Sequence, residues 1–247
     1  MSAGSGKRHG VARVISKLGM ASRSQATRWV QEGRVQVNGR VVRDAQFPLR
    51  QGVDRIEIEG QTLEAAPRLV LMLNKPRGLV TTARDERGRD TVYRCFAGAD
   101  LPWLAPVGRL DKASEGLLLF SNDPAWAARI THPLSGPDKV YHVQIDQLPS
   151  AALLEQIQRG VVLEGERLLA RSVRCLRSGA KHAWLEIVLS EGRNRHIRRL
   201  LAHFGVTALR VVRVKIGELA LGELPKEQWR LLTESEIEAV CGHSTPT

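Results

Sequence analysis

The order of apolar and polar residues predicts two helices near the start of the chain. Between residues 11 and 18, apolar side chains recur at the i, i+3, i+4, i+7 spacing of one helix face, and Gly19 fits the position just past a helix end. Ser22 is a favourable N-cap for a second helix, SRSQATRWVQEG, which Gly33 ends. We therefore expect two short helices over residues 11–33.

A small sheet is predicted directly after these helices. The segment RVQVNGRVV alternates around Asn38-Gly39, the strongest short hairpin signal, and DRIEIEG at 54–60 is typical of a closing strand. Together the elements predict one compact domain over residues 11–58. We expect a flexible basic tail over 1–10 and a linker over 59–68.

The rest of the chain predicts a larger domain over residues 69–235, followed by a C-terminal tail over 236–247. LVLML is a buried strand, SNDP starts a helix, and AWLEIVLSEG leads into an amphipathic helix, RNRHIRRLLAHFG. Strands and helices are mixed without a regular β-α-β rhythm. The predicted fold class is therefore α+β, with a mixed, mainly antiparallel sheet.

Composition narrows the functional classes. The longest apolar runs are too short to span a bilayer, and the first residues, MSAGSGKRHG, lack the apolar segment of a secretory signal, so we expect a cytoplasmic protein without membrane contact. Cys95, Cys175 and Cys241 are scattered and the histidines show no ligand spacing, so no metal is expected. No glycine-rich nucleotide loop is present, so no cofactor is expected.

The charge balance points to a polyanionic partner. The chain has 37 Lys and Arg against 26 Asp and Glu, a formal net charge of +11. Basic residues cluster over 13–43 and again over 190–215, where Glu191 is the only acid. Solvated surface charge explains many such clusters, but two with so few acids favour nucleic acid.

One carboxylate is placed unusually. In GRLDKASEGLLLFSND, residues 108–123, Asp111 precedes a run of leucines that reads as a buried strand. Taken alone, Asp111 is a turn or cap residue, a member of a structural ion pair, or a catalytic group. A carboxylate beside the core needs a cation nearby, either Arg109 or an arginine of EGRNRHIRR.

The first domain resembles an S4 RNA-binding domain over roughly residues 11–58. The resemblance rests on ARVISKLGMASRSQATRWVQEGRVQVNGRVV. In that family the second helix and the following strand contact structured RNA. The resemblance implies backbone contacts rather than sequence readout. The implied RNA-binding residues are Arg23, Ser24, Arg28 and Arg34.

Nearly the whole chain, roughly residues 11–235, resembles the RsuA-type family of ribosomal RNA pseudouridine synthases. The matching motifs, in the family's order, are LNKPRGLVTT, PVGRLDKASEGLLLFSND, DKVYHV, LSEGRNRHIRRLLAHFG and LRVVRVKIGELALGELPKEQWRLLT. The implied reaction breaks the N1–C1′ bond of a uridine, turns the uracil and rejoins it through C5, without a cofactor. The implied partner is ribosomal RNA or an assembly intermediate, bound by a monomer.

The same resemblance implies site residues. Asp111 is the catalytic aspartate, acting either as a nucleophile on C1′ or as a base on C2′; the residues do not separate these routes. Tyr141 receives the flipped base, and Arg198 pairs with Asp111, although Arg193 or Arg195 stays open for that pairing. Ile197 packs under the uracil. The implied RNA contacts in this domain are Arg109, Arg193, Arg195 and Arg199.

Alternatives remain at this level. A non-catalytic RNA-binding assembly factor would explain the fold, but not the intact set of Asp111, Tyr141 and Arg198. An RNA methyltransferase carrying an S4 domain would need a cofactor-binding glycine loop. The RNRHIRR form resembles large-subunit members of the family, which favours 23S over 16S ribosomal RNA.

Overall fold

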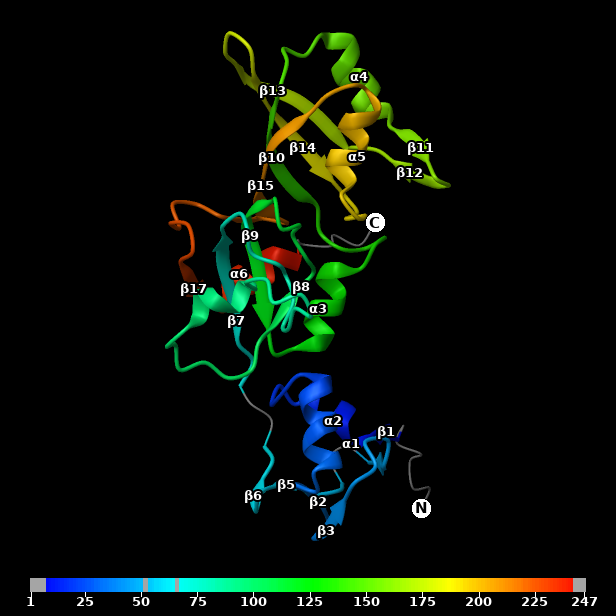
Figure 1. Ribbon diagram of the computed structural model, residues 1–247, viewed down its shortest axis with the longest axis vertical. Helices are drawn as coiled ribbons and strands as arrows, with labels where there is room; N and C mark the ends of the chain where they lie inside the picture. Colours follow the sequence, from blue (N-terminus) through cyan, green and yellow to red (C-terminus); the bar gives the residue numbers. More distant parts are fainter. Residues whose placement is uncertain (1–7, 51–52, 65–66, 242–247) are drawn as a thin grey trace. The chain divides into compact units, whose positions relative to one another are not determined.

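The computed structural model describes residues 8–50, 53–64 and 67–241. The chain divides into two compact units (Figure 1). One contains residues 1–69 with the short segments 99–105 and 121–124, and the other contains residues 70–98, 106–120 and 125–247. Within the described ranges, no helix is both long and apolar enough to cross a bilayer.

The N-terminal unit packs two helices on a small antiparallel sheet. Ser22 caps the second helix, since its Oγ accepts from Gln25 N at 3.1 Å, and Asn38 and Gly39 form the hairpin turn with positive φ angles of 51° and 76°. Both expectations are confirmed. The helices are α1 (Val11–Lys17) and α2 (Arg23–Gln31). The four-stranded sheet has the order β3 (Arg40–Val42), β2 (Val35–Val37), β5 (Ile56–Ile58) and β6 (Gln61–Thr62).

The predicted edges of this unit differ from the structure on both sides. β1 (His9–Gly10) pairs with β4 (Pro48–Leu49), so the tail predicted over 1–10 ends in a strand; residues 1–7 lie outside the described residues. β6 adds to β5 inside the segment predicted as a linker. Both strands are only two residues long, too short for a periodic pattern to reveal them.

The C-terminal unit is built on a nine-stranded mixed sheet, which confirms the α+β class. β9 runs parallel to β15, whereas β10 is antiparallel to both β14 and β15. The strand order is β13 (Ser172–Ser178), β14 (Ala183–Leu189), β10 (Lys139–Ile145), β15 (Ala208–Ile216), β9 (Glu115–Ser121), β7 (Val70–Lys75) and β17 (Trp229–Leu231), with β16 (Leu219–Ala220) on β15 and β8 (Ala105–Val107) on β9.

Helices pack on this sheet at several places. α4 contacts β13, α5 contacts β15 and α6 contacts β16. A core cluster around β7 and β9 contains Leu117, Leu119 and Trp126. The helices are α3 (Pro124–Thr131), α4 (Ala151–Arg159), α5 (His196–His203), α6 (Glu234–Cys241) and the 3-10 helix η1 (Val92–Phe96). A separate hairpin is formed by β11 (Val161–Leu163) and β12 (Glu166–Leu168).

The prediction of a C-terminal tail over 236–247 is wrong for residues 236–241, which belong to a helix. α6 occupies Glu234–Cys241 and buries Ile237 and Val240 in the same core cluster. Two apolar residues on one helical turn are too few to distinguish a packed helix from a polar tail by pattern alone. The remaining residues, 242–247, lie outside the described part.

Candidate active site

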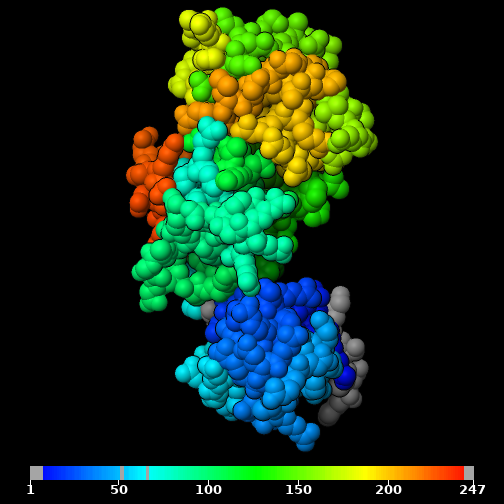
Figure 2. Space-filling model, in the orientation of Figure 1, coloured from blue at the N-terminus to red at the C-terminus, as the bar shows by residue number. Residues whose placement is uncertain are grey.

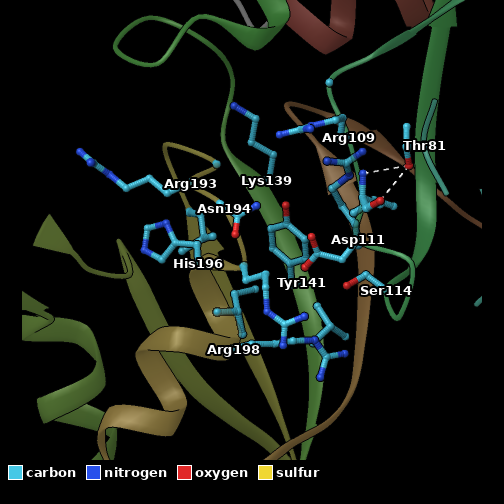
Figure 3. A pocket seen from close by; sticks show the side chains of 18 of the residues that line it. Thr81, Arg109, Asp111, Ser114, Lys139, Tyr141, Arg193, Asn194, His196 and Arg198 are labelled. Carbon is cyan, nitrogen blue, oxygen red and sulfur yellow. Dashed lines mark hydrogen bonds between the residues drawn. The ribbon is translucent and has the colours of Figure 1, made fainter. Parts of the chain in front are cut away.

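Asp111 lies on a tight turn that leads into the buried strand β9. The turn closes with a hydrogen bond from Ser114 N to the carbonyl of Asp111 at 2.9 Å. Thr81 holds the approach to the turn, because its Oγ1 donates to the Leu110 carbonyl at 2.8 Å and accepts from Leu110 N at 3.3 Å (Figure 3). Asp111 itself is half-buried, so its carboxylate is held at a fixed place at the edge of the core.

Lys75, at the end of β7, supports the turn from below. Its side chain has no exposed surface, and its Nζ donates to the carbonyls of Pro76 at 2.9 Å, Asp111 at 3.3 Å and Ser114 at 2.9 Å. Burial lowers the pKa of Lys75 to about 8, and the charge of Asp111 acts in the opposite direction. All three donor positions of the ammonium are used, so its desolvation is compensated by main-chain acceptors.

Tyr141 forms the facing wall of the site from β10. The strand lies between β14 and β15, and its pairing with β15 shifts register between Val140 and Tyr141. Such a bulge re-aims side chains locally. Only 8% of Tyr141 is exposed, and Figure 3 shows the carboxylate of Asp111 pointing toward its ring. An aromatic face and a carboxylate therefore share one cavity.

Arg198, on α5, connects the Asp111 turn to β15. Its guanidinium donates to the carbonyls of Ala208 at 2.7 Å and Ala113 at 3.2 Å. Within the described residues no ion pair joins Arg198 to Asp111, so the contact to the turn runs through the main chain. Burial, with the charge of Arg195, lowers the pKa of Arg198, while the negative charge of Asp111 raises it. Asp111 and Arg198 thus interact electrostatically without a direct salt bridge.

These side chains surround a cavity of about 470 Å³. That volume falls within the range of small-ligand sites and accommodates a flipped nucleotide base. The lining is strongly basic around the single carboxylate of Asp111. Of the predicted residues, the structure brings together Asp111, Tyr141, Arg198, Ile197, Arg109, Arg193 and Arg195. Other basic side chains of the lining are Arg89, Lys112, Lys139 and Arg213.

Arg199 lies outside the cavity and is already paired. Its guanidinium donates to Glu166 and, at 3.1 Å, to Glu164, both on the β11–β12 hairpin. Figure 2 shows this hairpin, in yellow-green, against the golden α5. Arg193 combines a place in the cavity wall with ion pairs to Glu191 at 2.8 Å and Glu166 at 3.6 Å. Two of the RNA contacts predicted in this unit, Arg193 and Arg199, therefore have internal carboxylate partners.

The predicted RNA contacts of the N-terminal unit lie on or next to α2. Arg23, Ser24 and Arg28 are exposed, and in the part of the chain that the structure describes neither Arg23 nor Arg28 has an ion-pair partner. Arg34 differs, because it pairs with Glu59 at 2.8 Å and stacks over Trp29 at 5.5 Å. The two free arginines are the side chains on this helix best placed to meet phosphate groups.

Sequence reasoning missed several residues that position the site. Lys75 and Thr81 both belong to LNKPRGLVTT. This motif contributes to the family resemblance, but none of its residues was assigned a role from the sequence. A lysine two residues after the apolar run VLML, at the end of the same buried strand, was the available signal, since an unpaired buried ammonium is costly. Lys139, two residues before Tyr141, also lines the cavity. No cluster of metal-binding side chains occurs among the described residues.

Comparison with known families gives two matches along the chain. The family described as RNA pseudouridylate synthase matches residues 69–203, and the S4 domain matches residues 11–54. The first match covers more than half of the chain and contains the Asp111 turn, Tyr141 and Arg198. The second covers α1, α2 and the first hairpin.

Full-length relatives agree with these matches. An uncharacterized RNA pseudouridine synthase of Aquifex aeolicus is 34% identical, covering 92% of this chain and 91% of its own. A protein of Bacillus subtilis named ribosomal large subunit pseudouridine synthase B is 33% identical, covering 91% and 92%. A crystal structure of a pseudouridylate synthase matches with a TM-score of 0.65 and 30% identity over 94% of this chain and 99% of that one.

Proposed function

The chain belongs to the RNA pseudouridine synthase family, and from this premise we propose that it isomerises a specific uridine of 23S ribosomal RNA to pseudouridine. The observation that carries the proposal is the cavity in which the Asp111 carboxylate faces the Tyr141 ring inside a basic lining. A basic lining attracts RNA, and a single carboxylate within it supplies a group that acts on the sugar.

Two chemical routes are compatible with one carboxylate. In the first, a carboxylate oxygen of Asp111 bonds to C1′ and the C1′–N1 bond breaks, leaving its electron pair on N1 of uracil. After the base turns, C5 attacks C1′ and the carboxylate leaves. In the second, Asp111 takes the C2′ proton, a C1′=C2′ double bond forms as N1 departs, and the proton returns to C2′ when C5 adds.

Both routes end with the same proton transfers. The C5 proton is lost from the rejoined base, and N1 gains a proton. Tyr141 is placed to hold the uracil plane during the turn, because an aromatic face can stack on either orientation of the base. Ile197, only 4% exposed, lies in the wall beside it as an apolar contact. Deuterium at C2′ slows only the second route.

The choice of substrate rests on the N-terminal unit and on the relatives. An S4 domain binds structured RNA, and the Bacillus subtilis relative is named for the large ribosomal subunit. We propose that the partner is free 23S ribosomal RNA or a ribosomal assembly intermediate. The protein would bind it in the cytoplasm as a monomer. The RNRHIRR segment, which contributes Arg193, Arg195 and Arg198 to the cavity, supports the same assignment.

Tritium release tests the proposal. Ribosomal RNA labelled with tritium at C5 of uridine should release label with the purified full-length protein, without added cofactor or metal. Mapping pseudouridine in 23S and 16S ribosomal RNA from cells with and without the protein then identifies the position. If neither RNA releases tritium, whether as a transcript or in a precursor particle, the proposed enzymatic activity is contradicted. If pseudouridine is found only in 16S ribosomal RNA, the proposed 23S substrate is contradicted.

A further inference from the structure

The loop between α3 and β10 presents a leucine almost completely to solvent at the rim of the basic cavity. Leu134 is 93% exposed, whereas the next most exposed large apolar side chain described in the C-terminal unit, Val162, is 65% exposed. Single exposed apolar residues are common on protein surfaces, so exposure alone assigns no role. Two further features distinguish Leu134: the hydrogen bonds that hold its loop, and the place of the loop next to the cavity.

The loop is internally braced rather than loose. Nδ1 of His132 accepts hydrogen bonds from the backbone N–H of Leu134 at 3.3 Å and of Ser135 at 3.1 Å. Gly136 N donates back to the His132 carbonyl at 3.0 Å, closing the turn. A Cβ on Gly136 would lie 2.5 Å from that carbonyl oxygen, so no other residue fits this position without moving the backbone.

The far end of the loop is tied as well. Asp138 forms an ion pair with Arg171, and its carbonyl accepts from Gly217 N at 2.9 Å. A side chain held on such a support loses little conformational entropy when it inserts into a partner. Leu134 is therefore displayed in a pre-organised way, although nothing in the fold requires an apolar group there.

The position of the loop indicates what Leu134 meets. Thr131 and Lys139, the residues on either side of the loop, both line the cavity that contains Asp111. Three residues of chain span at most about 11 Å, so Leu134 stays near this rim. With Arg109, Arg195 and Lys139 in the lining, the rim favours a polyanion over an apolar protein surface.

We propose that Leu134 inserts into the RNA base stack beside the target uridine and fills the space that the uracil leaves when it turns into the cavity. Enzymes that act on a base must extrude it, at a cost in stacking. Apolar side chains used as wedges between bases offset that cost by replacing the lost contacts. The inference rests on the proposed function and assigns Leu134 to the flipping step, not to the chemistry.

The test compares two RNA substrates under single-turnover conditions. One is the 23S fragment that the wild-type protein modifies, with the target uridine stacked in a helix; the other has the same sequence with that uridine opposite a gap. Leu134→Ala should slow isomerisation of the stacked substrate by about 10- to 100-fold and leave the gapped substrate within about twofold. Leu134→Met, which keeps the apolar bulk, should retain most of the wild-type rate on the stacked substrate.

Two further variants separate wedge insertion from a general surface effect. Val162→Ala, another exposed apolar truncation, should leave both substrates unchanged. His132→Ala, which removes the acceptor for two loop N–H groups, should slow only the stacked substrate, while His132→Asn keeps an acceptor and should recover the rate. 2-Aminopurine next to the target uridine should brighten on binding of the wild type, and much less with Leu134→Ala.

The outcomes are distinguishable. Wild-type protein that isomerises no ribosomal RNA overturns the proposed function and this inference with it. An active wild type with Leu134→Ala equal to Val162→Ala overturns the wedge alone, as does an equal loss on both substrates. Unchanged isomerisation with weaker binding to precursor ribosomes would assign Leu134 to a protein contact instead.

Discussion

The ammonium of Lys75 and the main chain of Asp111 are joined by a hydrogen bond of 3.3 Å, inside a region where Lys75 has no exposed surface. The cation therefore supports the backbone beneath the carboxylate and also carries a charge of opposite sign to it. Because Lys75 also reaches the Ser114 carbonyl at 2.9 Å, both ends of the turn depend on one side chain.

Removing this support should impair catalysis more than RNA binding. Lys75→Met keeps most of the side-chain volume but leaves three carbonyl groups without a donor. A displacement of the turn on the order of 1 Å costs about a hundredfold in rate, so we expect kcat to fall by about that factor while the Kd for RNA stays within about threefold. Single-turnover kinetics with fluorescence anisotropy measure both; equal losses would point to general unfolding.

Stability should depend on pH through the same lysine. Its pKa is about 8 in the folded protein against an ordinary 10.5. Between these values the unfolded chain binds more protons, so raising the pH favours the folded state. The wild type should gain about 3 kcal/mol in its free energy of unfolding relative to Lys75→Met between pH 8 and 10.5. Urea unfolding at several pH values measures the difference, and a constant difference would show that Lys75 keeps its ordinary pKa.

Asp111→Asn should abolish tritium release without loss of RNA affinity. The amide of asparagine is nearly isosteric with the carboxylate, so the hydrogen bonds from Thr81 and Lys75 to the backbone of the turn stay intact. The amide is, however, a poor nucleophile and a poor base. We expect a rate decrease of at least about a thousandfold. Release assays and anisotropy on the same RNA provide the measurement; simultaneous loss of binding would indicate a structural role for the carboxylate.

Tyr141→Phe should separate stacking from proton transfer. The phenyl ring keeps the aromatic face, so RNA affinity and base flipping should stay near the wild-type values. If the hydroxyl assists removal of the C5 proton, the final step slows by about 10²-fold or more. Tyr141→Leu serves as the comparison, because it removes the ring and should weaken both flipping and rate. A Tyr141→Phe protein with the full wild-type rate would limit Tyr141 to stacking.

Arg109 and Arg199 should differ in their contribution to RNA binding. Arg109 is exposed at the cavity and has no ion-pair partner among the described residues, whereas Arg199 is held by Glu164 and Glu166. Arg109→Ala should reduce the slope of log K against log salt by about one, and Arg199→Ala by clearly less. Affinity titrations from low to moderate salt give the slopes; similar values would mean that RNA displaces the two glutamates.

Local signals predicted much of the fold. Ser22 caps its helix as the sequence indicates, and its Oγ accepts from the backbone N–H of Gln25 three residues on. The Asn38-Gly39 turn also forms as expected, since its requirements are contained in two residues. These features depend on neighbours in the chain and are therefore readable without a structure.

Features that depend on distant residues were not predictable in the same way. The helix predicted over RNRHIRRLLAHFG begins only at His196, inside that segment, because Arg195 adopts a left-handed φ of 48°. The contacts of Arg198 join residues 10 and 85 positions away. The partners of Arg199 lie on a hairpin that periodicity did not reveal. Motif resemblance placed Asp111, Tyr141 and Arg198, but their actual hydrogen-bond partners required the three-dimensional structure.

The turn that carries Asp111 is anchored from outside entirely through main-chain atoms. Thr81, Lys75 and Arg198 bond the backbone of residues 110, 111, 113 and 114, and none of these bonds uses a side chain of the turn. The side chains of Lys112 and Ala113 are therefore not needed for these hydrogen bonds that hold the turn. An engineer could recode these two side chains to tune RNA preference, provided that the bonds from Thr81, Lys75 and Arg198 are left in place together with the hydrogen bond from Gly78 N to the Lys112 carbonyl at 2.8 Å.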